Sequence, residues 1–106
     1  MPKYLVSITY TAEGAKGLRK DGGTKRRSVA AKAIESLGGK LESLYFCFGS
    51  QDAIVIADLP DAASAAGLCL AIAATGSVRP TTTVLITPEE MDHAAGKKTA
   101  YKAPGA

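Results

Sequence analysis

The feature that most constrains this chain is the order in which two hydrophobic periods follow one another along its 106 residues. Apolar and polar residues that alternate with period two predict strands, and apolar residues spaced three or four apart predict helices. The periods here run strand, helix, strand, strand, helix, strand, and a short helix closes the series. This order predicts an α+β fold, the ferredoxin-like βαββαβ arrangement with a four-stranded antiparallel sheet.

Four segments carry the strand pattern: residues 3–10, 40–48, 53–59 and 78–87. Strict alternation in the second segment predicts Tyr45 on one face and Phe46 and Phe48 on the other. It also predicts that Leu41, Ser43 and Cys47 share the face of Tyr45. Pro80 cannot donate a backbone hydrogen bond, so we expect the last strand at an edge of the sheet.

Helix boundaries are marked by capping residues and glycines. Thr11 caps a first short helix, and Gly22-Gly23 interrupts it. Thr24 is the expected cap of the main helix, which stops at Gly38-Gly39. Asp61 begins the next helix after Pro60. The sequence Thr87-Pro88-Glu89-Glu90 predicts a capping box for a last short helix.

The two main helices are expected on one face of the sheet because both crossovers are right-handed. The other face then keeps large apolar side chains, and an uncovered apolar sheet face is unstable in water. A second copy of the chain, packed sheet against sheet, would cover it. We therefore expect a homodimer or a higher homo-oligomer.

Composition excludes several classes of protein. No segment approaches the roughly 20 apolar residues of a membrane span, and no secretory signal pattern precedes the first strand. Cys47 and Cys69 lie in apolar runs without metal-binding spacing, which predicts two buried, reduced thiols. We expect a cytoplasmic protein with no metal site and no cofactor.

Basic residues concentrate between Lys16 and Lys32, against the single acid Asp21. No aromatic residue interleaves them for base stacking, and no nucleic-acid-binding motif is present, so we do not expect nucleic-acid binding. A solvated helix face is the favoured interpretation. Contact between this basic helix and an anionic partner, such as an acidic protein, remains an open alternative.

Several short segments, taken together and in order, resemble the GYD-domain family over about residues 1 to 95. That family takes its name from a Gly, a Tyr and an Asp in the hairpin between its second and third strands. Gly49 and Asp52 match this set, whereas Gln51 stands where the tyrosine is expected. The segments are Met1-Pro2-Lys3-Tyr4-Leu5, Gly14-Ala15-Lys16, Ser36-Leu37-Gly38-Gly39-Lys40-Leu41, Gly49 to Asp52, Asp58-Leu59-Pro60-Asp61, Gly76-Ser77-Val78-Arg79, Thr81-Thr82-Thr83 and Thr87-Pro88-Glu89-Glu90-Met91.

The resemblance implies membership of the dimeric α/β-barrel superfamily, which includes cofactor-free monooxygenases, haem-dependent enzymes and ligand-sensing domains. It supports fold and assembly more than function, because one fold hosts many activities. It also implies one GYD-like domain over residues 1–96. The tail over residues 97–106 is basic and without periodicity, and we expect it to be flexible.

The candidate site residues are few. Asp52 and His93 are candidate catalytic groups, Asp52 as an acid in the hairpin and His93 as a base that titrates near neutral pH. Turn chemistry for Asp52 and simple solvation for His93 are the alternatives. Arg79 could clamp an anion or pair with Asp52 or Asp58. Tyr10, Tyr45, Asp52 and Arg79 are the candidate ligand-binding residues.

The sequence therefore favours a small homo-oligomer that binds a small ligand in a cleft between sheet and helices, or that serves as an assembly module. The alternative is a cofactor-independent enzyme, monooxygenase-like or isomerase- or lyase-like, that acts on a small organic molecule. In that case Asp52, His93 and Arg79 would form its polar set. The absence of a paired catalytic set in the sequence favours binding over catalysis.

Overall fold

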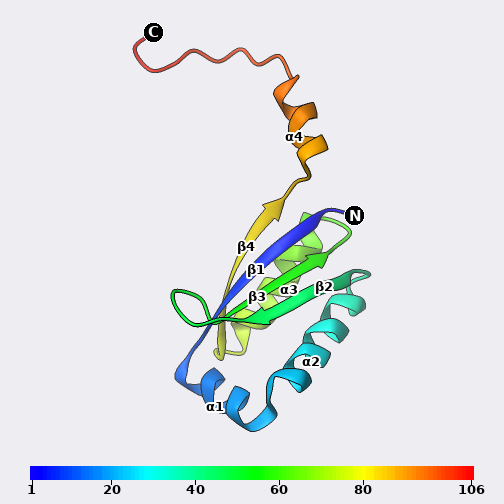
Figure 1. The fold of residues 1–106 in the computed structure, drawn as a ribbon, viewed down its shortest axis with the longest axis vertical. Helices are drawn as coiled ribbons and strands as arrows, with labels where there is room; N and C mark the ends of the chain where they lie inside the picture. The colour runs from blue at the N-terminus through cyan, green and yellow to red at the C-terminus, as the bar shows by residue number, and fades with distance from the viewer.

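A computed structural model describes all 106 residues, and it confirms the predicted α+β arrangement. Its four strands form one antiparallel sheet in the order β2-β3-β1-β4, as a ferredoxin-like fold requires (Figure 1). The longest helix has 14 residues, and no helix is both long and apolar enough to cross a bilayer. The elements are β1 (Lys3–Tyr10), α1 (Ala12–Asp21), α2 (Gly23–Ser36), β2 (Lys40–Phe46), β3 (Ala53–Asp58), α3 (Ala62–Ala74), β4 (Val78–Leu85) and α4 (Pro88–Ala95).

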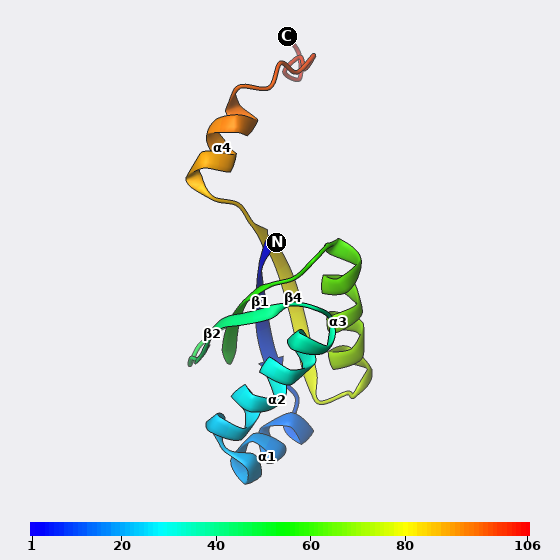
Figure 2. The same cartoon turned by 90° about the vertical axis from the view of Figure 1, so that its right-hand side faces the viewer.

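The core lies between one face of the sheet and helices α2 and α3, which cover the same side (Figure 2). Alternate residues of the two central strands point into it, because side chains of a strand alternate between faces. Ile34 of α2 and Leu68 of α3 pack against them. The predicted placement of both main helices on one face is therefore confirmed. The strand residues of the core are Tyr4, Val6, Val55 and Ala57.

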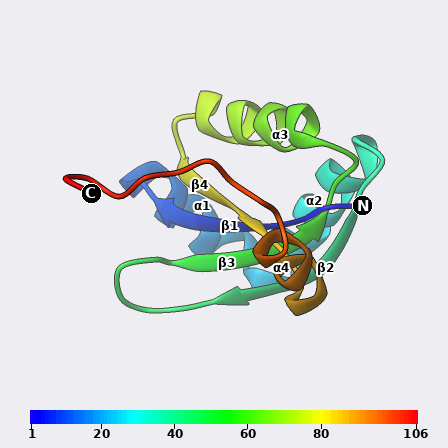
Figure 3. The same ribbon diagram turned by 90° about the horizontal axis from the view of Figure 1, so that it is seen from above.

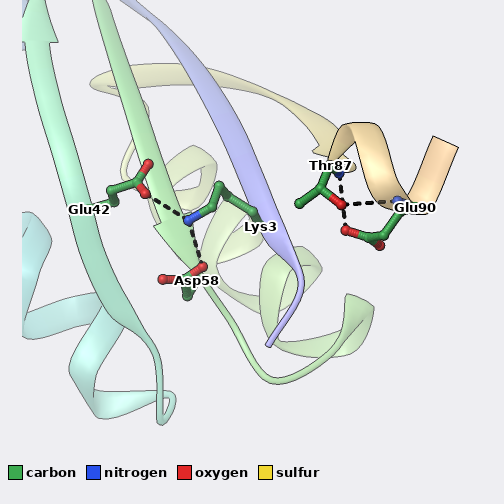
Figure 4. A network of polar contacts seen from close by, with 5 residues as sticks. All are labelled: Lys3, Glu42, Asp58, Thr87 and Glu90. Carbon is green, nitrogen blue, oxygen red and sulfur yellow. Dashed lines mark hydrogen bonds and ion pairs between the residues drawn. The ribbon is translucent and has the colours of Figure 1, made fainter. Parts of the chain in front are cut away.

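The other face of the sheet, which we call the open face, has no helix over it. It carries the alternate residues of the same strands, including Leu5, Ile54 and Ile56. At one end of this face the Lys3 ammonium donates to Glu42 at 2.8 Å and to Asp58 at 2.9 Å, which ties β1, β2 and β3 together (Figure 4). The hydrogen bonds to Glu42 and Asp58 raise the pKa of Lys3.

The first connection holds two helices separated by one residue. Gly22 caps the end of α1 and the start of α2 at once, with φ at +81°, a left-handed conformation that glycine adopts without strain. The break predicted at Gly22-Gly23 is thus confirmed. The predicted cap at Thr24 is wrong, because the turn at Gly22 lets the second helix begin at Gly23 without any side-chain cap.

Strict alternation in β2 is also wrong. A β-bulge shifts the register between Leu41 and Ser43, so Leu41 shares the helix-covered face with Leu44 and Phe46 rather than with Tyr45. The strand ends at Phe46, two residues earlier than predicted. Phe48 therefore lies in the hairpin loop, which projects from the sheet (Figure 3), and its side chain is fully exposed.

The chain leaves the sheet after β4, an edge strand as Pro80 predicts. Strand β4 ends at Leu85 rather than at Thr87, because Thr87 already caps α4. The predicted capping box is confirmed, since the Thr87 hydroxyl accepts from the Glu90 amide at 3.0 Å and the Glu90 carboxylate accepts from the Thr87 amide at 3.1 Å. We call residues 86–106 the arm. It extends beyond the end of the sheet, and the molecule is 55 Å long and 33 Å by 22 Å across (Figure 1).

Two glycines of α1 provide a matched test of this packing. A Cβ at Gly14 would overlap the carbonyl oxygen of Ser77, next to the hydrogen bond from the Thr11 amide to that oxygen, whereas a Cβ at Gly17 meets nothing within 4 Å. We expect Gly14→Ala to destabilise the fold by about 1–3 kcal/mol through overpacking. Gly17→Ala should stabilise it by up to about 1 kcal/mol through helix propensity. Thermal unfolding measures both, and equal melting temperatures for the two variants would contradict the close approach of α1 to the loop before β4.

Candidate functional site

A cleft opens between the sheet and the two helices that cover it. Its inner part is a cavity of about 100 Å³, and 13 of its 14 lining residues are hydrophobic. Strand β1 supplies Val6 and Ile8 to the floor, and α3 supplies Leu68 and Ile72 to one wall. The exception to the apolar lining is Arg26 of α2. The inner cavity is therefore an apolar compartment with a single charged group at its edge.

An outer cavity of about 380 Å³ adjoins the inner one and shares Tyr10, Arg26 and Ala33 with it. It is more polar than the inner cavity, because α1 and the loop before β4 add hydrophilic groups, although 8 of its 15 lining residues are hydrophobic. Apolar depth and a polar mouth are the arrangement of ordinary small-molecule sites, in which hydrophobic walls give affinity and a few polar groups fix orientation. The added polar residues are Glu13, Asp21, Thr75 and Ser77.

The sequence builds this cleft with small side chains at the surfaces that face each other. Ala30 and Ala33 of α2 line it where larger residues would fill the space above β1. Arg26 and Val29 precede them at helical spacing, so that all four lie on one face of α2. The sequence favoured a solvated helix face for the basic residues between Lys16 and Lys32, Arg26 among them. The spacing of Arg26 from the other three residues on its face of α2 was the signal that could have placed it in a cleft.

Tyr10 ends β1 at the mouth of the cleft. Burial raises the pKa of its phenol, the guanidinium of Arg26 partly opposes that rise, and the carboxylate of Asp52 adds to it. A phenol held in its neutral form can donate one hydrogen bond and accept another. Tyr10 was predicted as a ligand-binding residue, and the structure places it where the inner and outer cavities meet.

Arg26 does not carry a free charge into the cleft. Its Nη1 lies 3.7 Å from Oδ2 of Asp21, and the other carboxylate oxygen of Asp21 lies 3.4 Å from Nζ of Lys25. The mouth thus holds a cation and a carboxylate side by side, with Glu13 nearby. Such a pair suits a ligand with a neutral polar group better than a strongly charged one, because either charge sign meets repulsion as well as attraction.

Asp52 holds the hairpin to the end of β1. Its carboxylate accepts from the Tyr10 amide at 2.8 Å, its own amide donates to the Ile8 carbonyl at 2.8 Å, and its carbonyl accepts from the Cys47 amide at 2.9 Å. These contacts hold the backbone of Tyr10 in place at the end of β1. The geometry thus gives Asp52 a supporting position beside the cleft, outside the cavity lining itself.

Tyr45 and Arg79 lie away from the cleft. Tyr45 pairs with Ile54, and Arg79 pairs with Thr9, both at positions whose side chains belong to the open face. Tyr45 is 71% exposed. Arg79 forms no ion pair with Asp52 or Asp58, and Asp58 is bonded by Lys3 instead. These two candidates therefore belong to the surface that has no helix over it.

His93 lies on α4 in the arm, fully separate from Asp52. The strand register places Asp52 beside Ile8 and the start of the arm beside Lys3, which at about 3.3 Å per residue separates the two ends by about 17 Å before α4 begins. A single chain therefore does not bring Asp52 and His93 together. No group of three or more His, Cys, Asp or Glu residues is placed to hold a metal ion.

The model of the GYD domain family matches residues 4–95, which span all of α4 and all four strands except Lys3 at the start of β1. No curated protein and no solved structure matches the sequence. The family match confirms the resemblance seen in the sequence and extends over the whole cleft.

The position of Tyr10 makes a prediction about alkaline pH. Because its pKa is higher in the folded chain than in the unfolded one, the folded state retains the phenol proton after the unfolded state has lost it. Stability is therefore fully present below the ordinary tyrosine pKa of about 10 and falls as the pH rises above it. We expect Tyr10→Phe to lose less stability than the wild type between about pH 9 and pH 11.

Thermal unfolding across this pH range measures the difference. Tyr101→Phe is the matched control, because Tyr101 is 68% exposed in the segment after α4 and lies outside the sheet. Parallel curves for the wild type and Tyr10→Phe would contradict the assigned environment of Tyr10.

Proposed function

Since the chain belongs to the GYD domain family, we propose that it is a homodimer whose subunits each bind a small organic molecule in the cleft between sheet and helices. One observation carries this proposal. The inner cavity is lined by hydrophobic side chains except at Arg26, and it opens into a polar mouth at Tyr10. An apolar group that fills such a cavity leaves water and so contributes to the affinity of its ligand.

The cleft favours a particular chemistry in its ligand. The inner cavity of about 100 Å³ has the size of one small ring or a short aliphatic group, and the outer cavity leaves room for a larger polar part. At the mouth the Tyr10 phenol and the Arg26–Asp21 pair offer both donors and acceptors. We propose a ligand with an apolar ring or short chain and one uncharged polar group, such as a hydroxyl or carbonyl.

Binding is favoured over catalysis by the placement of the polar groups. The alternative, a cofactor-independent enzyme, needs Asp52, His93 and Arg79 to converge on one substrate. In one chain His93 lies beyond the opposite end of the sheet from Asp52, and the carboxylate of Asp52 is engaged by the Tyr10 amide. No observation within a single subunit supports a catalytic step.

The proposed dimer uses the open face. Its centre is apolar, with Leu5, Ile54 and Ile56 on the two middle strands, and Tyr45 and Leu85 extend it toward the edges. Contiguous apolar surface of this kind marks an interaction site on a soluble protein. A second sheet packed at about 10 Å would remove it from water.

The proposal includes a cytoplasmic location. Cys47 and Cys69 form no disulfide. The Cys47 thiol donates a hydrogen bond to the Gln51 carbonyl, and the Cys69 thiol shares a hydrogen bond with the Thr82 hydroxyl. Both are half-buried rather than fully buried as the sequence predicted. Free thiols are usual in a reducing compartment.

A cleft-filling variant tests ligand binding. We expect Ala33→Leu to fill the junction of the two cavities and to weaken binding of 2-naphthol, used as a probe with one ring system and one hydroxyl, by at least about tenfold. A ¹⁵N-resolved NMR titration measures the affinity and should show the largest shifts at Ala30, Leu68 and Ile72 in the wild type.

Ala66→Leu is the matched control, since Ala66 is exposed on α3 and lines neither cavity. It should bind the probe as the wild type does. Shifts confined to the open face, or equal affinity for Ala33→Leu, would refute the cleft as the binding site.

A charge placed on the open face tests the dimer. Ile56→Asp would bury an unpaired carboxylate between the sheets, and we expect it to raise the dimer dissociation constant at least about a hundredfold. Sedimentation velocity measures the change. Leu70→Asp is the matched control, because Leu70 is 71% exposed on α3, on the other side of the molecule. A monomeric wild type, or an Ile56→Asp variant that dimerises normally, would exclude this interface.

A further inference from the structure

Helix α4 has an apolar side that nothing in its own chain covers. All eight of its residues are exposed, and Met91 is 54% exposed. Helical spacing places Pro88, Met91, Ala94 and Ala95 on one half of the helix, and Glu89, Glu90, Asp92 and His93 on the other. An isolated helix of this length is marginal in water even with a good cap. A stable α4 therefore needs a surface to pack against.

The charges of α4 indicate what kind of surface that is. Glu89, Glu90 and Asp92 place three carboxylates within four residues. The α1–α2 region, at the other end of the molecule (Figures 1 and 2), carries seven basic residues from Lys16 to Lys32 against Asp21 alone. Helix α4 itself is complementary in charge to the α1 end, whereas Lys97, Lys98 and Lys102 after it are basic. Complementary potentials bring partner surfaces together in a fixed orientation.

The α1 end also has an apolar hollow. A groove of about 460 Å³ lies between α1 and the β2–β3 hairpin, and Leu18, Phe46 and Phe48 are among its lining residues. Phe48 is fully exposed and Phe46 is 38% exposed, so two aromatic rings stand uncovered there. Arg19 lies in the same lining. We call this hollow the α1 groove; it offers apolar contact and positive charge, the two properties that α4 requires.

We infer that α4 of one copy docks in the α1 groove of a second copy, so that the two chains exchange their arms. This inference rests on the proposed dimer through the open face. Within one chain α4 and α1 lie beyond opposite ends of the sheet (Figure 1), and the groove lies against α1. Two sheets stacked face to face with their strands antiparallel place the α4 end of each copy beside the α1 end of the other.

The exchange completes a group of residues that one chain leaves apart. The α1 groove is lined by Tyr10 and Asp52, and α4 carries His93. Docking brings His93 of one copy to the end of the sheet where Asp52 of the other copy lies. The only histidine of the chain would then stand beside the cleft mouth in the dimer, although no single subunit places it there.

A charge exchange tests this docking in the full chain. Glu89→Lys/Asp92→Lys reverses the charge of α4 and spares the capping residue Glu90. Lys16→Glu/Arg19→Glu reverses the charge of Arg19 in the groove lining and of Lys16, exposed three residues before it on α1. We expect each pair to raise the dimer dissociation constant about tenfold, because two attractive contacts become repulsive. The four substitutions together should restore it to within about threefold of the wild-type value. Sedimentation velocity at low ionic strength measures all four proteins.

The outcomes separate this inference from the proposed dimer. If Ile56→Asp dissociates the protein while both charge pairs leave it dimeric at the wild-type affinity, the open-face dimer stands and the arm exchange is wrong. If each charge pair weakens the dimer and the combined variant does not recover, the pairing of α4 with the groove is wrong, because the combined variant has the wild-type net charge. A monomeric wild type overturns both.

Discussion

Helices cover only one face of the four-stranded sheet, and the rest of the structure depends on this constraint. Strand β1 pairs with β3 on one side and β4 on the other, so its alternate residues set what each face of the sheet presents. Tyr4 and Val6 are buried under the helices, whereas Leu5, between them, points to the face without helices. Because both right-handed crossovers leave the sheet on the same side, the chain has no element left to cover the other. The cleft on one face and the open apolar surface on the other both follow from this arrangement.

The cleft exists because helices α2 and α3 do not fill all of the space above the sheet. Ile34 and Leu68 seal the helices to the sheet near its middle, and both are almost fully buried. Toward Tyr10 the facing residues of α2 include the small side chains Ala30 and Ala33, and the space that they leave is not filled by α1. Protein interiors are otherwise close-packed, and an unfilled apolar volume costs stability. A chain that keeps such a volume next to a tyrosine and an arginine loses packing energy at a place where a ligand would recover it.

Much of the fold could be predicted from the sequence, because its signals are local. The capping residues Thr11, Asp61 and Thr87 each accept the backbone hydrogen bond that their position predicts. The failures occur where the decisive contact is distant or depends on backbone geometry. The bulge near Leu41 reverses the alternation expected for the start of β2, and no side-chain pattern in β2 marks it. The turn at Gly22 replaces the cap expected at Thr24.

The candidate site shows the difference between local signals, which the sequence reveals, and distant contacts, which it does not. Tyr10 could be singled out from the sequence because an aromatic residue at the end of a strand is a conspicuous feature, but its neighbours could not. Arg26 reads as one more member of a basic run until α2 is seen against the sheet. Asp52 and His93 are both conspicuous in sequence, yet the antiparallel register places them at opposite ends of the sheet. Proximity in three dimensions is set by strand register, and residue type alone carries no information about it.

Tyr10 connects the surfaces that this architecture creates. It lines the inner cavity, the outer cavity and the α1 groove, and its backbone amide is held by Asp52. A molecule in the cleft and a helix in the groove would therefore both contact Tyr10. Contacts that share one residue cannot be energetically independent, and any coupling between them acts equally in both directions. Ligand binding that favours one orientation of Tyr10 would strengthen or weaken the dimer by the same factor by which dimerisation changes ligand affinity, so that assembly and binding form a single equilibrium.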